Sequence, residues 1–142
     1  MTDIGVLVQK TLDEVFFPLG VYTFWQRKME TAGGNKDEHI VYTRDGGDDG
    51  FFADNKVLTL TKNITIYYRY DESKLDSNEG RMLVKQREQL ICKTMEDAGF
   101  ILVDGPFDSG TSEYAGSRRG DGFYKSEMNF EHWSVADEPA RH

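Results

Sequence analysis

The first stretch of the chain places its apolar residues at the spacing of a helix. The residues on this face are Ile4, Leu7, Val8, Leu12, Val15 and Phe16. Intervals of three and four bring them together on one side of an α-helix, so we predict a helix over residues 3–17. Thr2 or Asp3 supplies a suitable N-cap. Pro18 ends the helix because proline cannot continue the hydrogen-bond ladder.

A second apolar stripe at helical spacing predicts a helix from about Asn78 to Ala98. Its apolar positions are Leu83, Leu90, Ile91, Met95 and Ala98. Gly99 follows directly and suits a left-handed C-terminal cap, which favours glycine.

Two short segments rich in aromatic and β-branched residues, 21–26 and 39–43, predict strands. The run Asp-Gly-Gly-Asp-Asp-Gly over 45–50 follows the second of them. Aspartate and glycine favour turns, so we predict a loop there.

The clearest alternation of apolar and polar residues covers 57–70 and predicts a long, half-buried strand. Lys62 interrupts its apolar face. The strand therefore either extends past the core or contains a bulge at that point.

Two more strands are predicted near the C-terminus. The short apolar run 100–103 is bounded by Gly105 and Pro106, and a polar loop is expected over 107–121. Alternation over 123–130 predicts the closing strand. Residues 134–142 lack periodicity and are expected to form a frayed tail.

This order of elements predicts an α+β fold, α-β-β-β-α-β-β. We expect a mostly antiparallel sheet of four to five strands, with one face covered by two amphipathic helices. The other face, rich in Thr, Lys and Glu, is expected to be solvated or to serve in assembly. A length of 142 residues fits one domain over 1–142.

Composition narrows the class of protein. Hydrophobic residues make up 38% and charged residues 30% of the chain, which is typical of a globular domain. No apolar run is long enough to cross a membrane, and no secretory signal is expected at the N-terminus. The single cysteine, Cys92, indicates a reducing compartment or indifference to redox conditions.

The chain is acidic. Seventeen basic and twenty-five acidic residues give a net charge of −8. This charge argues against a general nucleic-acid binder, because neutralising phosphates requires clustered Lys and Arg.

The acidic run at Asp45, Asp48 and Asp49 is a weak candidate for calcium. With Asp45 as the first ligand, the twelfth position is Lys56, where a bidentate glutamate is needed. A solvated turn is the favoured interpretation, and we expect no metal and no cofactor.

Other candidate contact residues flank this run and the second predicted loop. Phe51 and Phe52 either project as docking side chains or fold back into the core. Arg118 and Arg119 suit an acidic protein surface, since guanidinium groups pair with carboxylates. The tripeptide that ends in Asp121 is interpreted as a turn.

No motif of an enzyme is evident. The three histidines are scattered, and no nucleophile elbow or phosphate-binding loop is present. Cys92 lies in the middle of a predicted helix, where a small buried hydrophobe is the usual explanation. We therefore predict a protein without catalytic activity.

The whole order resembles the tail terminator and tail-completion proteins of long-tailed bacteriophages, which join tail to head. The resemblance covers about residues 3–133. It rests on the following segments: the helix ending in Phe16-Phe17-Pro18, the strand at Tyr42-Thr43, the long strand 58–70, the helix ending in Met95-Glu96-Asp97-Ala98-Gly99-Phe100, and the closing strand 123–130.

The resemblance implies a structural protein of a phage or prophage that forms a ring, usually a hexamer. Its expected partners are other copies of itself, the tail tube protein and the head connector, with DNA only passing through the ring. It is expected in the virion, at the tail or head-tail junction, after assembly in the bacterial cytoplasm. An acidic lumen would repel the passing DNA.

In such a ring the loops 45–55 and 106–121 are the best candidates for contact, and Arg118 or Arg119 is expected to meet Asp48 or Asp49 of a neighbour. The alternative function is a small soluble protein-binding or regulatory domain that forms no ring and has no catalytic activity.

Overall fold

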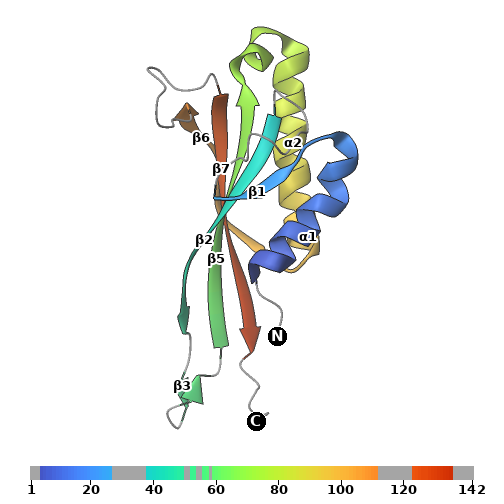
Figure 1. Cartoon of the computed structure of the whole chain (residues 1–142). Helices are drawn as coiled ribbons and strands as arrows, with labels where there is room; N and C mark the ends of the chain where they lie inside the picture. The colour runs from blue at the N-terminus through green and yellow to red at the C-terminus, as the bar shows by residue number, and fades with distance from the viewer. Residues whose placement is uncertain are drawn as a thin grey trace.

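The computed structural model describes residues 4–26, 38–49, 52–53, 56–57, 59–111 and 123–135; side chains are described within 4–26, 38–44, 62–108 and 124–133. The described residues form a mixed sheet of five strands in the order β1-β2-β5-β7-β6, a separate two-stranded pair β3-β4, and two α-helices. Figure 1 shows both helices on the same side of the sheet. The predicted α+β class and order of elements are confirmed.

Helix α1, Ile4–Phe16, follows the predicted pattern. Val8, Leu12 and Phe16 are fully buried. The α-helix passes into a short 3-10 turn, Phe17–Leu19, that contains Pro18. Gly20 closes this turn in the left-handed conformation with φ 80°, so the helix ends where the proline predicts.

Helix α2, Asn78–Asp97, begins after a short 3-10 helix, Glu72–Asp76, and is capped by Ser77, whose hydroxyl accepts a hydrogen bond from the Gly80 amide at 3.0 Å. Val84, Ile91 and Met95 are buried, whereas Leu83 is half-buried. The predicted face is therefore turned slightly, from Leu83 toward Val84. Gly99 has φ +97°, which confirms the predicted left-handed position after the helix.

Strand β1, Thr23–Trp25, is shorter than predicted and pairs in parallel with β2, Glu38–Asp49, placing Thr23 opposite Ile40. The predicted loop at 45–50 is wrong over Asp45–Asp49, which continue β2 against β5. The long neighbouring strand supplies hydrogen-bond partners, and these outweigh the local turn preference of Asp and Gly.

Strands β5, Thr59–Asp71, and β7, Phe123–Val135, are paired along their whole length. Ile64, Ile66 and Tyr68 face the core and are fully buried. Lys62 is exposed, because β5 extends past the core. An irregularity of register also occurs beside it, in β2, between the partners of Asn63 and Lys62.

The strands beyond Ile64 form a three-stranded extension that we call the arm. It consists of Asp45–Asp49 of β2, 59–63 of β5 and 131–135 of β7. In Figure 1 these segments run past the ends of both helices. Since Ser134 and Val135 belong to β7, the tail predicted over 134–142 starts later; residues 136–142 lie outside the described part.

Strand β6, Ile101–Thr111, continues beyond Gly105 and Pro106, which were expected to end it. The loop predicted over 107–121 is therefore wrong over 107–111, which belong to β6. Its register against β7 shifts at three places. Gly105 has φ +96°, and a Cβ there would lie 2.3 Å from the Glu127 carbonyl oxygen. A glycine therefore permits the strand to bend without leaving β7.

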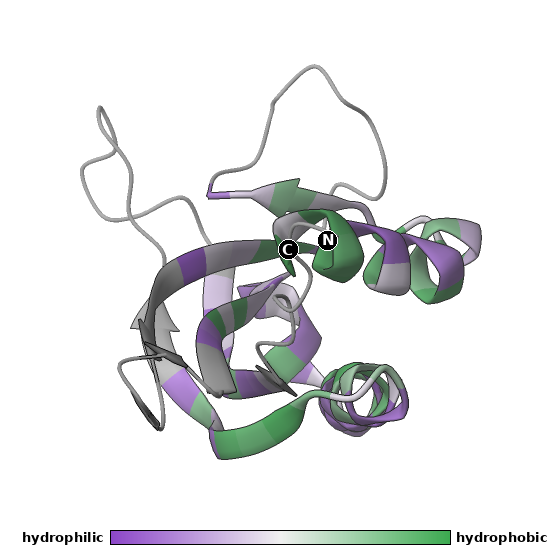
Figure 2. Ribbon diagram, turned by 90° about the horizontal axis from the view of Figure 1, so that it is seen from below, coloured by the Kyte–Doolittle hydropathy of each residue, from purple (hydrophilic) through white to green (hydrophobic). Residues whose placement is uncertain are grey.

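The two faces of the sheet differ. Figure 2 shows the sheet curled, with α1 and α2 on one side of it. On the face away from the helices, His39 and Val41 are buried, and the His39 ring meets Phe24 edge-on at 6.1 Å. Over β6 and β7, in contrast, the same face of the sheet carries exposed side chains such as Ile101 and Trp133. This face is therefore covered over β2 and exposed over β6 and β7, and its expected role in assembly stays a prediction.

Candidate functional site

The structure places the predicted contact residues on different elements. Asp45, Asp48 and Asp49 lie in β2, where they pair with Asn63, Thr61 and Leu60 in that order. They therefore belong to a strand and not to a loop, and the register of this pairing is irregular between Asp45 and Gly47.

The aromatic pair and the basic loop are described only in part. Phe52 lies in β3, Phe52–Ala53, which pairs with β4, Lys56–Val57. Phe51, Arg118, Arg119 and Asp121 lie outside the described residues. The pairing of these arginines with the β2 aspartates stays a prediction.

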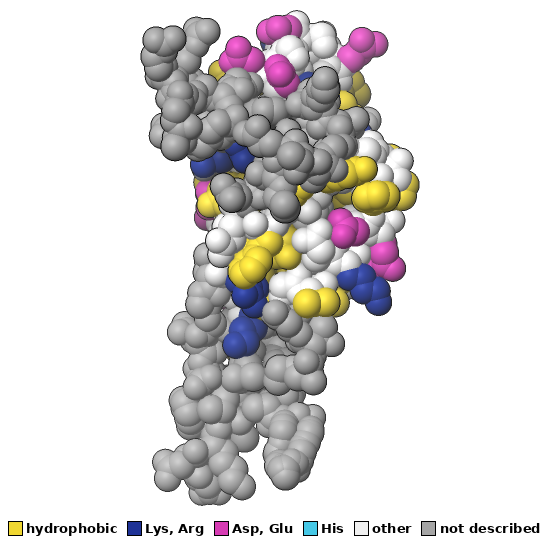
Figure 3. Space-filling model, in the orientation of Figure 1, with side chains coloured by type: hydrophobic (Ala, Val, Ile, Leu, Met, Phe, Trp, Pro, Cys, Tyr) yellow, Lys and Arg dark blue, Asp and Glu magenta, His cyan; other side chains and the backbone are white. Residues whose placement is uncertain are grey.

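A groove lies elsewhere, between α1 and the sheet edge formed by β1 and β2. It has a volume of about 600 Å³. Its lining residues are Gly5, Val6, Gln9, Lys10, Asp13, Glu14, Trp25, Tyr42 and Arg44. Figure 3 shows hydrophobic side chains gathered beside basic ones on this view of the molecule.

Trp25 and Arg44 line this groove at the sheet edge. Trp25 is opposite Tyr42 in the β1–β2 pairing, so it projects on the helix side of the sheet. The Arg44 guanidinium lies 4.8 Å from the centre of the Trp25 ring, a cation–π distance. Trp25 nevertheless remains 49% exposed, so about half of its surface is available for a contact.

Two hydrogen bonds hold α1 against this edge. The Tyr42 hydroxyl donates to the Gly5 carbonyl oxygen at 3.2 Å, and the Gln9 amide donates to the Thr23 carbonyl oxygen at 2.9 Å. A Cβ on Gly5 would lie 3.1 Å from Cδ of Arg44. Gly5 thus lets the helix approach closely, and the groove has fixed walls on both sides.

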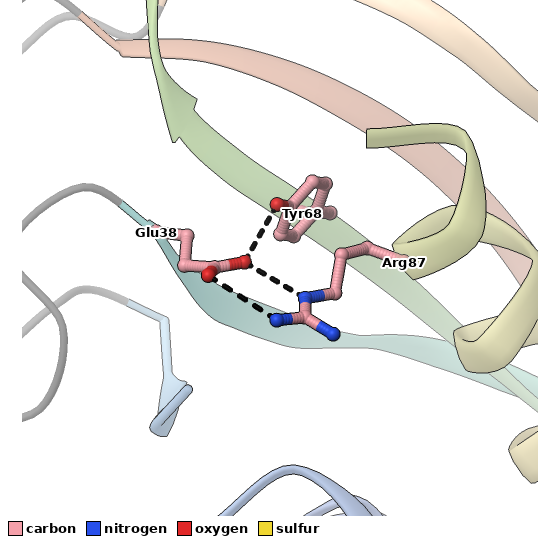
Figure 4. Close-up of polar contacts among 3 residues, drawn as sticks. All are labelled: Glu38, Tyr68 and Arg87. Carbon is pink, nitrogen blue, oxygen red and sulfur yellow. Dashed lines mark hydrogen bonds and ion pairs between the residues drawn. The ribbon is translucent and has the colours of Figure 1, made fainter. Parts of the chain in front are cut away.

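A buried polar cluster joins β2, β5 and α2 on the helix side of the sheet. Figure 4 shows Glu38, Tyr68 and Arg87 pointing toward one another. The Glu38 carboxylate accepts hydrogen bonds from the Tyr68 hydroxyl at 2.7 Å and from Arg87 Nε at 3.0 Å. Glu38 is 3% exposed. Burial acts to lower the pKa of Arg87, but its hydrogen bond and charge interaction with Glu38 raise that pKa overall.

This cluster is best explained as part of the core. A buried carboxylate has to be paired and hydrogen-bonded, and here a guanidinium and a phenol satisfy that need. The three groups clamp two strands to a helix. The partners of all three groups belong to this chain.

A second group of polar side chains lies near the start of β7. The Ser126 hydroxyl donates a hydrogen bond to the Glu88 carboxylate. The Tyr70 ring stacks on Tyr68 with centroids 5.4 Å apart and lies 6.2 Å from Tyr124. Burial, followed by the charges of Asp108 and Glu88, raises the pKa of Tyr70. Tyr70 therefore stays a neutral phenol at physiological pH.

The Cys92 thiol is the remaining candidate for a reactive group. Burial and the charges of Glu96 and Glu88 raise the pKa of Cys92 to about 11, so its thiol is a poor nucleophile. In the described part of the chain, no three His, Cys, Asp or Glu side chains are grouped to hold a metal. No helix in that part combines the length and hydrophobicity that crossing a membrane requires.

Comparison of the chain with models of known protein families gives no match, and comparison with curated proteins gives none either.

Sequence reasoning missed the groove because its residues are far apart in the chain. The signals were Phe24 followed directly by Trp25, and Arg44 at the position that continues the core-facing Ile40 and Tyr42. Neighbouring strand residues point to opposite faces, so two consecutive large aromatics cannot both enter one core. The position of α1 beside them is a tertiary property.

Proposed function

We propose that this chain is a structural subunit of a phage or prophage tail: a ring-forming tail terminator or head-tail joining protein. The observation that carries the proposal is the presence of exposed large apolar side chains at both edges of the sheet. Val6 and Trp25 are 58% and 49% exposed at the β1 edge, and Ile101 and Val103 are 55% and 56% exposed at the β6 edge.

Such surfaces favour assembly. Exposed apolar patches mark protein contacts more often than they mark the surface of a free monomer. A ring subunit needs two different patches, one for each neighbour. The element order that resembles tail terminator proteins adds independent support, and so does the arm, which offers paired strands outside the helix-covered core.

In this role the subunit has no catalytic function. It forms a ring, which the resemblance to tail terminator proteins implies is usually a hexamer. The ring binds the tail tube protein on one side and the head connector on the other. The chain carries a net charge of −8, and an acidic surface facing the lumen repels phosphates so that DNA passes without sticking. The protein assembles in the bacterial cytoplasm and ends in the virion.

Deleting the gene from an inducible prophage that carries it tests this function. The expected products, seen by negative-stain electron microscopy, are abnormally long tails or separate heads and tails. Expression of the wild-type chain from a plasmid should restore normal particles. Normal particles after deletion would contradict the proposed function.

A second candidate function is a protein-binding domain that takes one partner and forms no ring. The groove favours it, because a cavity of about 600 Å³ with apolar walls and a few charged groups is of the size that accepts a ligand or a peptide side chain. A normal phage yield after deletion, together with a strictly monomeric chain, would support this candidate.

A further inference from the structure

The outer face of β6 and β7 is a second apolar surface with charged residues at defined positions. Ile101 pairs with Glu131, and Phe107 pairs with Glu127, so each pair shares one face of the sheet. Trp133 lies on the same face, since its indole N–H donates to the Glu131 carboxylate at 2.9 Å. Ile101, Phe107 and Trp133 are 55%, 40% and 46% exposed. We call this set the outer face.

The charges of the outer face are mainly acidic. Asp104 pairs with Asn129 on this face, beside Glu127 and Glu131. The basic Lys125 on the same strand lies over the Tyr67 ring at 5.1 Å. A partner of the outer face therefore needs an apolar surface with a cation next to it.

The sheet edge of the groove has that chemistry, because Arg44 lies over Trp25 there. Val6 adds an apolar side chain to the lining; Lys10 is a second cation, and Asp13 and Glu14 are the carboxylates on the α1 side. Trp25 is stacked with a guanidinium, whereas Trp133 is bonded to a carboxylate. Each surface thus combines an exposed tryptophan with a charge, and the two charges have opposite signs.

The position of the two surfaces prevents them from meeting within one copy. The groove borders β1 and the outer face borders β6, and these strands are the two ends of the sheet order β1-β2-β5-β7-β6. A two-fold dimer would join the outer face to itself and bring carboxylates together, which is unfavourable. A contact between unlike surfaces leaves one of each free for the next copy.

We propose that the groove of one copy binds the outer face of the next copy, head to tail, with Trp25 and Arg44 against Trp133 and Glu131. This inference names the subunit contact of the ring and rests on the proposed function. Repetition of the contact places every subunit in the same environment and closes a ring when the rotation per step divides a full turn.

Two single-substitution variants, measured alone and as a mixture of the two proteins, test the contact. Val6→Asp changes the groove and Ile101→Asp changes the outer face; both side chains are more than half exposed, so the fold is expected to persist. Each should weaken self-association about a hundredfold, because a carboxylate would have to be desolvated in an apolar contact. Met82→Asp, at a side chain 62% exposed on α2, is the matched control and should assemble like the wild type.

The mixture distinguishes a head-to-tail contact from a two-fold one. Each variant alone should sediment as a monomer, while an equal mixture should give a dimer, because one intact groove can still meet one intact outer face. Native mass spectrometry should show one copy of each variant in that dimer. Trp25→Ala with Trp133→Ala should reproduce the pattern.

Three results would overturn the inference. They are a wild-type chain that stays monomeric at the highest soluble concentration, variants that assemble like the wild type, and a mixture that yields monomers. Expressing the Val6→Asp chain in the deletion strain distinguishes failure of the proposed contact from failure of the proposed function. If deletion disturbs the tails but Val6→Asp restores normal particles, the function stands and the contact is wrong; if the mixed dimer forms but deletion leaves particles normal, the reverse holds.

Discussion

At the scale of single residues, the burial of the Glu38 carboxylate is possible only because other side chains bind it. It is buried, and its compensation comes from Arg87 on α2 and Tyr68 on β5. Residues separated by 49 and 30 positions therefore decide whether this charge is tolerated. In the groove, Trp25 and Arg44 are likewise distant in the chain and form their cation–π contact only in the folded protein.

Replacing Arg87 by Leu should destabilise the protein by about 3–5 kcal/mol, because the carboxylate of Glu38 would lose its charged partner in the core. Chemical denaturation followed by circular dichroism measures this loss. Lys93 provides a matched control, since its ion pair with Asp97 at 2.9 Å is on the surface of the same helix. Lys93→Leu should leave the unfolding midpoint nearly unchanged; an equal loss in both variants would contradict this explanation.

His132 should make stability depend on pH. Its ring packs against Phe100 at 4.8 Å, and partial burial lowers its pKa below the ordinary 6.5. The unfolded chain therefore takes up a proton at a higher pH than the folded chain does. The contribution of His132 to stability is fully present above pH 6.5 and is lost as the pH falls from 6.5 through the lowered pKa.

The measurement is the difference in unfolding free energy between the wild type and His132→Phe over pH 5–8. The variant should lose less stability than the wild type on going to the acidic end of this range. Parallel curves for the two proteins would show that another group is responsible.

At the scale of elements, the junction before α2 is packed tightly. The first turn of α2 contains Gly80, and a Cβ there would lie 2.1 Å from the Lys74 carbonyl oxygen of the preceding 3-10 helix. The obstacle is backbone, so it cannot turn away as a side chain would. Gly80 therefore allows the two helices to follow one another closely.

Gly80→Ala should destabilise the protein by roughly 1–3 kcal/mol through this overlap. The sign is informative, because replacing glycine by alanine inside a helix is ordinarily favourable by about 1 kcal/mol. Thermal unfolding gives the measurement, with Gln86→Ala at an exposed position of the same helix as control. A stabilised Gly80→Ala variant would show that the junction relaxes easily.

At the scale of the whole molecule, the protein has a helix-covered part and the arm. On the helix side of the sheet Ile64 and Phe130 are buried, whereas Lys62, two positions beyond Ile64 on the same face of β5, is exposed. Backbone pairing continues across this boundary to Thr59 and Val135. The arm is thus held by its strand ladders without the hydrophobic cover of α1 and α2.

Hydrogen exchange in the monomeric Ile101→Asp variant should reflect this division. Amides of 59–62 should exchange faster than those of 64–70, because opening the arm exposes less buried apolar surface than opening the core. Mass spectrometry of peptides that end near residue 63 resolves the two parts. Equal protection along β5 would show that the strand opens as one unit.

The sequence by itself determined the elements whose pattern is local. Helical spacing and Gly99 located α1 and α2, and alternation located the core-facing residues of β5 and β7. These features depend on neighbours a few positions away, which the chain order contains directly. The α+β class followed from their order.

The tertiary structure alone decided the rest. Asp45–Asp49 became strand because β5 offered partners, β1 joined β2 in parallel, and β6 continued through Gly105 because β7 lies beside it. The groove needed α1 to be packed on the opposite edge from β6. Such pairings join segments that are distant in the chain, and their energy depends on contacts that no local pattern specifies.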